Sequence, residues 1–207
     1  MNKMIRLLTA LALFGSASIA QAAYIAHLED TTGGGGFFGT VKFEDVAPGE
    51  VLVTADISSP VNLGLRTGDI LGLWFEFATF ISDDMVVLGD LISFTAANNG
   101  VSNTLGGNIN LIGAADGGWD LGVRVGTPGA PDGFNQVRQL SFVGTGLTAE
   151  DLLGQRVGMR VQSISGIDFD PASSKLLGVT TVPEPGVLGL MLMGLGMIGF
   201  GARRRQR

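Results

Sequence analysis

Apolar and polar side chains alternate in short runs along the middle of the chain. In residues 51–58 every second side chain is apolar, and the same period of two recurs in 73–80 and 157–162. Successive side chains of a strand point to opposite faces, so this period predicts strands with one buried face. Four further runs have the same character: 37–44, 85–95 with a break near Gly89-Asp90, 119–125 and 136–143.

Turn-forming residues separate these runs. Glycine stands beside asparagine or aspartate at 98–100, 106–108, 116–118 and 132–133. Many short strands with this turn chemistry favour an all-β fold, and we expect one β-sandwich-like domain over residues 23–182. A short helix is also expected, because Thr148 and Asp151 are spaced as a capping box and Gly154 can end the helix.

Composition narrows the chemistry by exclusion. The 207 residues include 33 glycines, one histidine and no cysteine, so disulfide bonds, a cysteine nucleophile and multi-histidine metal sites are ruled out. Residues 23–182 carry seven basic and 18 acidic side chains, a net charge of −11. That charge repels a phosphate backbone, so the sequence argues against nucleic acid as a partner. Solubility is the simpler explanation of the acidity.

Residues 1–22 have the three parts of a secretory signal peptide. A short basic start is followed by the apolar run 7–19, and then by Ala20 and Ala22 in the small-x-small spacing that signal peptidase accepts. We expect cleavage between Ala22 and Ala23, with Ala20 as the nearby alternative. The apolar run is too short for a comfortable membrane span. The sequence therefore predicts export through the secretion machinery.

A second apolar segment lies near the C-terminus. Residues 186–202 contain 17 uncharged side chains, which as a helix would be about 25 Å long, close to the thickness of a bilayer core. Arg203, Arg204 and Arg205 follow directly, and such a cluster stays on the cytoplasmic side. We expect one transmembrane helix at about 186–202, the basic tail 203–207 inside and the domain outside. A buried core helix is the alternative, which the adjacent arginines oppose.

Val182, Pro183, Glu184 and Pro185 stand just before this span. The two prolines fix their own φ and favour extended conformations in the residues before them, so Glu184 is displayed on a stiff, non-helical segment. A signal peptide, Val-Pro-Glu-Pro, a short apolar span and a terminal arginine cluster, in this order, resemble the PEP-CTERM class of bacterial surface proteins. The sorting and anchor segment is then residues 183–207.

This resemblance implies processing by an exosortase, a membrane enzyme taken to recognise the Pro-Glu-Pro segment. The protein would first be membrane-anchored through its C-terminus. Removal of the tail would then make the span a sorting intermediate and release the protein to the cell surface or matrix. The class is associated with bacteria that make exopolysaccharide and biofilm matrix, which makes exopolysaccharide a candidate partner. Residues 155–163 and 173–176 also resemble a tract often seen before the motif, and this tract has no catalytic role.

Few side chains of the central region suggest a binding or catalytic role. Trp74 and Trp119, together with Tyr24, are candidates for stacking on sugar rings, although aromatic residues in strands more often belong to the core. His27 is the sole imidazole of the chain, and a surface position on a first strand fits it better than catalysis. The nucleophile pattern G-x-S-x-G does not occur in the sequence.

Paired carboxylates occur at Asp83-Asp84 and at Asp168 and Asp170. Calcium prefers such oxygen ligands, but neither pair completes a known calcium loop, so solvated loop acids are the simpler interpretation. The G-x-G-x-x-G string at 34–39 precedes a strand pattern rather than a helix, which excludes a dinucleotide site. We expect no metal site and no cofactor.

The leading hypothesis is therefore an exported, non-enzymatic protein with a structural or adhesive role at the cell surface or in an exopolysaccharide matrix. A carbohydrate-binding module displayed on the envelope is the alternative. An envelope glycoside hydrolase that uses paired carboxylates is the remote alternative.

Overall fold

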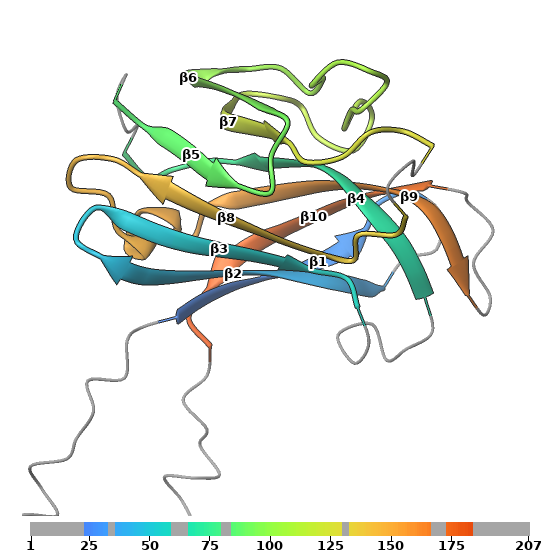
Figure 1. The fold of residues 1–207 in the computed structure, drawn as a ribbon, viewed down its shortest axis with the longest axis horizontal. Helices are drawn as coiled ribbons and strands as arrows, with labels where there is room; N and C mark the ends of the chain where they lie inside the picture. The colour runs from blue at the N-terminus through green and yellow to red at the C-terminus, as the bar shows by residue number, and fades with distance from the viewer. Residues whose placement is uncertain are drawn as a thin grey trace, which may run out of the picture.

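The computed structural model describes residues 23–32, 36–58, 66–79, 84–129, 133–166 and 173–183. Figure 1 shows that this part of the chain is built almost wholly from strands. In chain order the elements are β1 (Ala23–Asp30), β2 (Phe37–Ala47), β3 (Glu50–Asp56), β4 (Arg66–Phe75), β5 (Val86–Gly89), β6 (Ser93–Val101), β7 (Trp119–Arg124), β8 (Val137–Val143), the 3₁₀ helix η1 (Ala149–Leu152), β9 (Arg156–Gly166) and β10 (Ser173–Thr181). None of the helices in these residues is long and apolar enough to cross a membrane.

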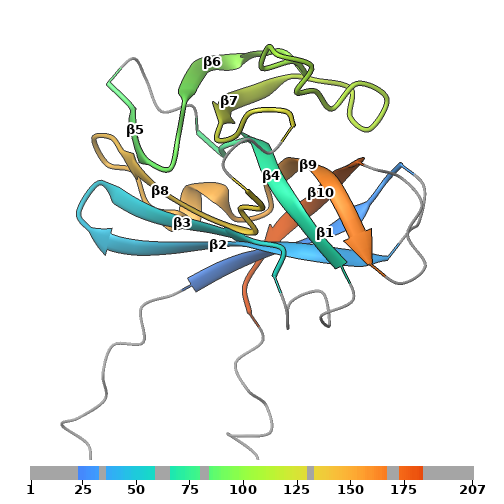
Figure 2. The same ribbon diagram turned by 45° about the vertical axis from the view of Figure 1, so that its right-hand side comes forward.

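All ten strands belong to one antiparallel sheet, in the order β5-β8-β3-β2-β1-β10-β9-β4-β7-β6. The sheet curls so far that its two edge strands, β5 and β6, come near each other at residues 90–92 (Figure 2). The all-β prediction is confirmed, but the two separate sheets of a β-sandwich are not formed. Alternation of apolar and polar residues indicates which face of a strand is buried, but it does not determine which strands pair. In this protein the strands pair into a single sheet that forms a nearly closed barrel.

The barrel interior is filled by apolar side chains from every strand except β6, whose residues are almost all exposed. Strand β3 has buried side chains at every second position, as the sequence pattern predicted. Phe75 lies at the centre of an aromatic group, with its ring edge-on to Phe43 at 6.1 Å and to Phe142 at 5.0 Å between centroids. These three residues come from β4, β2 and β8, so the core joins strands from opposite sides of the sheet.

A second apolar cluster lies outside the barrel, beneath residues 102–118, which we call the covering loop. The cluster contains Leu71, Trp74, Val101, Ile109, Leu111 and Trp119. Trp74 on β4 pairs with Gly158 of β9 on one side and with Gly122 of β7 on the other. The missing side chains leave a trough that is filled by Leu111 and the Trp119 indole over Gly158, and by Leu105 over Gly122.

The strand predictions are largely confirmed, with differences at the ends. Strand β4 runs from Arg66 and stops at Phe75 rather than continuing to residue 80. The chain leaves the sheet there, because the Phe77 N–H donates to a carboxylate oxygen of Asp120 (2.9 Å) and the Ala78 N–H donates to the Asp151 carbonyl (2.7 Å).

The helix prediction is also confirmed. The hydroxyl and N–H of Thr148 both bond the Asp151 carboxylate at 2.9 Å, which makes the expected capping box of η1.

Strand β10 was not predicted. Its buried positions include Ser174 and Thr180, which are polar and give no period-two apolar signal. Ser174 can be buried because its hydroxyl donates a hydrogen bond to the buried carboxylate of Asp30 on β1. The strand is therefore held by backbone pairing and a buried polar contact rather than by a run of apolar side chains.

The two ends of the described chain lie side by side. Strand β1 begins where β10 ends, since Ile25 pairs with Thr181 (Figures 1 and 2). On the other side of β10, the antiparallel register runs from Ser173, at the start of that strand, through Gln162 of β9 to Asp69 of β4, so Asp69 lies toward the end of the barrel away from Thr181. The barrel thus has a terminal end, which carries both chain ends, and a far end.

Candidate functional site

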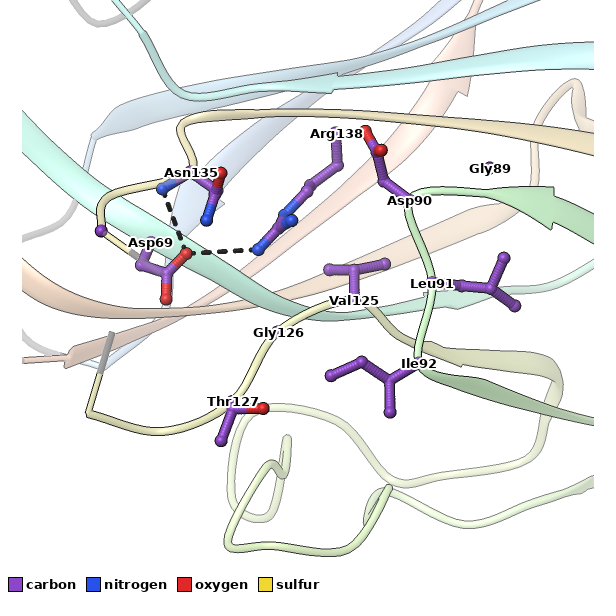
Figure 3. Close-up of a pocket in the computed structure, with 11 residues that line it drawn as sticks. Asp69, Gly89, Asp90, Leu91, Ile92, Val125, Gly126, Thr127, Asn135 and Arg138 are labelled. Atoms are coloured by element: carbon purple, nitrogen blue, oxygen red, sulfur yellow. Dashed lines mark hydrogen bonds and ion pairs between the residues drawn. The ribbon is translucent and has the colours of Figure 1, made fainter. Parts of the chain in front are cut away.

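A polar pocket of about 320 Å³ lies where the start of β8 faces β4 (Figure 3). Its lining comes from β4, the β5–β6 turn, the segment after β7 and the start of β8. The lining residues are Asp69, Gly89, Asp90, Leu91, Ile92, Val125, Gly126, Thr127, Gly133, Asn135 and Arg138. The volume lies at the lower end of the range for small-molecule sites.

A buried ion pair forms the floor of this pocket. Arg138 Nη2 lies 3.5 Å from Asp69 Oδ1, and the side chains are 14% and 3% exposed. The Asn135 N–H donates to the same Asp69 oxygen at 3.2 Å. In Figure 3 the guanidinium crosses the pocket from β8 toward Asp69 and passes close to Val125. A carboxylate this deeply buried needs such partners, because an isolated charge is costly to remove from water.

Arg138 uses little of its hydrogen-bonding capacity. Nη2 makes two long contacts, both at 3.5 Å, to Asp69 Oδ1 and to the Ile70 carbonyl. Nε is buried and has no partner among the described residues. Within the same residues, Nη1 donates to no acceptor either, although a guanidinium has five N–H donors. A mostly buried arginine with unused donors is unusual, since buried polar groups are normally paired.

The β5–β6 turn forms one wall and is held rigidly. Both the N–H and the carboxylate of Asp90 bond the backbone of Gln139, at 2.9 and 3.0 Å. Gly89 has φ +105°, and a Cβ there would lie 2.5 Å from the Gln139 carbonyl oxygen. Only glycine fits this position, which explains the break that the sequence showed at Gly89-Asp90.

Two exposed apolar residues lie in the lining of the pocket or next to it in the sequence. Ile92 is 54% exposed, and Phe134, which stands between the lining residues Gly133 and Asn135, is 60% exposed. Thr127 and the amide of Asn135 contribute polar groups to the lining, and neither side chain has a hydrogen-bond partner in the described part of the chain. Sequence reasoning missed Phe134, because a lone aromatic residue in a glycine-rich loop belongs to no periodic pattern.

The two tryptophans predicted as sugar-stacking candidates are fully buried, which corrects that prediction. Trp74 Nε1 donates to the Ser102 carbonyl at 3.1 Å, and Trp119 Nε1 donates to Asn103 Oδ1 at 2.7 Å. Both rings therefore lie under the covering loop as core residues, the alternative that their strand positions favoured. Tyr24 is half-buried and packs against the barrel core.

His27 is exposed on β1 and its ring lies against Phe37, with 5.4 Å between centroids. Asp84 is exposed and accepts a hydrogen bond from the Thr145 N–H at 3.3 Å. Asp83, Asp168 and Asp170 lie outside the described residues. Among the residues that the structure describes, no three acidic, histidine or cysteine side chains are grouped so as to hold a metal ion.

A second charged group fastens the covering loop to the barrel. Arg156 Nε donates to Glu76 Oε1 at 2.9 Å, and its Nη2 donates to the Gly117 carbonyl at 3.1 Å. The guanidinium carbon lies 4.9 Å from the centroid of the Trp119 ring. The hydrogen bond to Glu76 raises the pKa of Arg156 above its ordinary value, so this group stays charged and acts as a clamp.

The predicted sorting residues begin where β10 ends. Val182, at 55% exposure, and Pro183 are both exposed beyond Thr181. Glu184, Pro185, the span 186–202 and the arginines 203–205 lie outside the described residues. So do Ala20 and Ala22, while Ala23 is the first residue of β1.

Comparison with known families identifies this segment. Residues 181–205 match the model of the PEP-CTERM protein-sorting motif. The chain carries a PEP-CTERM sorting signal. Proteins with a PEP-CTERM motif are exported and anchored at the cell surface through it, and the motif implies processing by an exosortase. The match starts at the last residue of β10, so the PEP-CTERM segment follows the barrel without a linker.

Other comparisons add little to the PEP-CTERM assignment. A search of curated proteins found no significant match. One solved structure, from work on adhesion of Streptococcus parasanguinis by Fap1 fimbriae, is similar over 80% of this chain and 98% of its own, with 12% identity and a TM-score of 0.35. A similarity this distant carries no argument about function.

Proposed function

We propose that this chain is an exported, non-enzymatic protein that is displayed at the cell surface or in an exopolysaccharide matrix, where its role is structural or adhesive. The observation that carries the proposal is the PEP-CTERM motif at residues 181–205, joined directly to a folded β-domain. The signal peptide expected at 1–22 would export this domain. The span expected at 186–202, with Arg203, Arg204 and Arg205, would hold it at the membrane until an exosortase acts.

The fold supports such processing. Strand β10 is paired on both sides, with β1 and with β9, and it ends at Thr181. A cut at or beyond Glu184 would leave every strand of the barrel in place. Because β1 starts beside the end of β10, both tethers of the exported chain would leave the barrel at its terminal end. The domain can therefore fold outside the membrane while either tether is still attached.

A Glu184→Ala variant tests the sorting role, with Glu29→Ala, at an exposed position of β1, as the matched control. We expect all three chains to be exported. The Glu29→Ala surface form should differ in mass from the wild type only by its substitution, whereas Glu184→Ala should also change the C-terminal cleavage and so shift the mass further. One intact-mass measurement reports both the signal-peptide cleavage site and the C-terminal cleavage site. If the mature Glu184→Ala protein differed in mass from the wild type by no more than its substitution, the motif would have no role in processing.

The non-enzymatic part of the proposal is tested separately. The mature protein is expected to be inert against a broad panel of glycoside hydrolase substrates. Turnover that is lost when Asp69 or Asp90 of the pocket is replaced by asparagine would favour the hydrolase alternative instead.

A further inference from the structure

We propose that the pocket floored by Asp69 and Arg138 binds one unit of a neutral, hydroxyl-rich saccharide. The inference rests on the proposed surface function and gives it a ligand class. The proposed sugar site is therefore this pocket toward the far end of the barrel, and not Trp74 and Trp119, which are buried.

The first argument is the unused donors of Arg138. The guanidinium lines the pocket and is mostly buried, yet its only contacts within the described residues are two at 3.5 Å from one nitrogen. A ligand oxygen in the pocket could accept from Nη1 or Nη2 at normal distance. Charge-assisted hydrogen bonds of this kind are stronger than neutral ones.

The second argument is the mixture of groups around the guanidinium. Thr127 offers a hydroxyl that both donates and accepts, and the Asn135 amide does the same through its two ends. A sugar hydroxyl also donates and accepts, so neighbouring hydroxyls on one ring match this set. Ile92 and Val125 give the pocket apolar surface for the C–H groups of the ring.

Phe134, next to the lining residues in the sequence, would supply an aromatic surface beside the pocket. Its ring is 60% exposed and it lies between two residues that line the pocket. Aromatic rings combine a large apolar face with low conformational cost, so an exposed ring here could stack on the C–H face of a sugar. No other exposed phenylalanine adjoins the pocket lining so directly in sequence among the described residues.

Charge selects the class of sugar. Asp69 and Asp90 outnumber Arg138 in the lining, and residues 23–182 carry a net −11. An acidic polysaccharide would be repelled by both. A neutral saccharide is not repelled by these negative charges and can still form the hydrogen bonds described above.

The position of the pocket suits a surface protein. The strand register places Asp69, on the floor of the pocket, in the row of Ser173, at the end of β10 away from Thr181 where the chain would join the membrane. A protein held at its terminal end would present this pocket outward. Many copies on one surface, facing a polymer of repeated units, can hold firmly even where each site is weak.

The experiment uses the full-length chain purified in detergent and three variants: Phe134→Ala, Thr127→Val and Arg138→Lys. Phe37→Ala is the control, because Phe37 is also an exposed phenylalanine, at 41%, and does not line the pocket. The probes are neutral oligosaccharides of glucose, galactose and mannose, with an oligouronate of equal length for comparison. Binding is followed by ligand-observed NMR, which detects dissociation constants on the order of millimolar.

We expect the wild type to bind at least one neutral oligosaccharide and to discriminate against the oligouronate. Phe134→Ala, Thr127→Val and Arg138→Lys should each weaken binding by about fivefold or more, and Phe37→Ala by less than twofold. If Arg138→Lys does not fold, the two exposed-site variants decide the test, since neither residue has a side-chain partner in the described structure.

Three results would overturn the inference: no binding of any neutral probe by the wild type, equal binding by the pocket variants, or preference for the oligouronate. Cell fractionation of the same wild-type chain separates this failure from failure of the proposed function. If the chain is found at the cell surface but binds no neutral sugar, only the proposed sugar-binding pocket is refuted. A chain that never reaches the surface removes the surface function on which the pocket rests.

Discussion

The covering loop packs on strands β4, β7 and β9 only because glycines line the trough beneath it, and Gly158→Ala tests this directly. A Cβ on residue 158 would lie 2.4 Å from Leu111 Cδ1 and 3.2 Å from Trp119 Cη2. Carbon atoms pack at about 3.5–4.0 Å, so the loop must shift. The backbone of residue 158 is not in the left-handed region, so the expected cost is steric.

The magnitude follows from two opposed effects. Replacing glycine by alanine removes freedom from the unfolded chain, which stabilises by about 0.4–1 kcal/mol. Overpacking a filled core costs about 1–3 kcal/mol. We therefore expect Gly158→Ala to lower the free energy of unfolding by about 1–2 kcal/mol, and the melting temperature by about 2–4 °C for each kcal/mol lost.

Urea unfolding of the mature protein, followed by tryptophan fluorescence, measures this cost where it arises, since Trp74 and Trp119 both lie in the affected cluster. The decisive comparison is a double-mutant cycle with Leu111→Ala, which removes the clashing methyl. In that background Gly158→Ala should cost less by about 1 kcal/mol or more.

Gly39→Ala on β2 is the matched control. Its Cβ would lie 2.7 Å from Ile57 Cγ2 and 2.9 Å from the Asp56 carbonyl oxygen, far along the sheet from Leu111. Its cost should be the same in both backgrounds. If Gly158→Ala were neutral, or equally costly with and without Leu111, the loop would not be seated on residue 158 as described.

Three further changes test other parts of the structure. Asp69→Leu leaves the Arg138 guanidinium buried without its carboxylate and should lower the free energy of unfolding by about 3 kcal/mol. Adding Arg138→Met should restore most of the lost stability. If urea unfolding shows no restored stability in the double variant, the ion pair is contradicted. Arg156→Met removes the contacts to Glu76, Gly117 and Trp119 and should cost about 2 kcal/mol, read from the thermal midpoint; a loss below about 0.5 kcal/mol would argue against the clamp. Changing the arginines 203–205 to serine should weaken membrane retention in cell fractionation, and a wild-type tail protected from protease on the cytoplasmic side would contradict the expected topology.

Local patterns in the sequence were sufficient for the strands whose buried side is apolar. Strand β3 and helix η1 form as predicted, because alternation and a capping box act over a few neighbouring residues. Strand β10 was not predicted because some of its buried positions, such as Ser174, are polar. The hydrogen-bond partner of Ser174 is Asp30, which is 144 residues away in the sequence. A contact at that separation leaves no trace in a local pattern.

The candidate site was the hardest part to foresee. Asp69, Asp90 and Arg138 are spread along 69 residues and carry no motif, and they meet only because β4, the β5–β6 turn and β8 converge toward one end of the barrel. The tryptophans suggested a sugar site, yet the covering loop buries both. Burial depends on what lies above a strand, and alternation within the strand does not report it.

The sequence by itself determined the all-β class, most strand positions and the C-terminal sorting signal, because each is written in residues close together along the chain. The tertiary structure alone decided that the strands close into one barrel, that both chain ends share one end of it, and that a polar pocket lies toward the other. Those features depend on the register between distant strands, which is set when the whole sheet buries its apolar face at once.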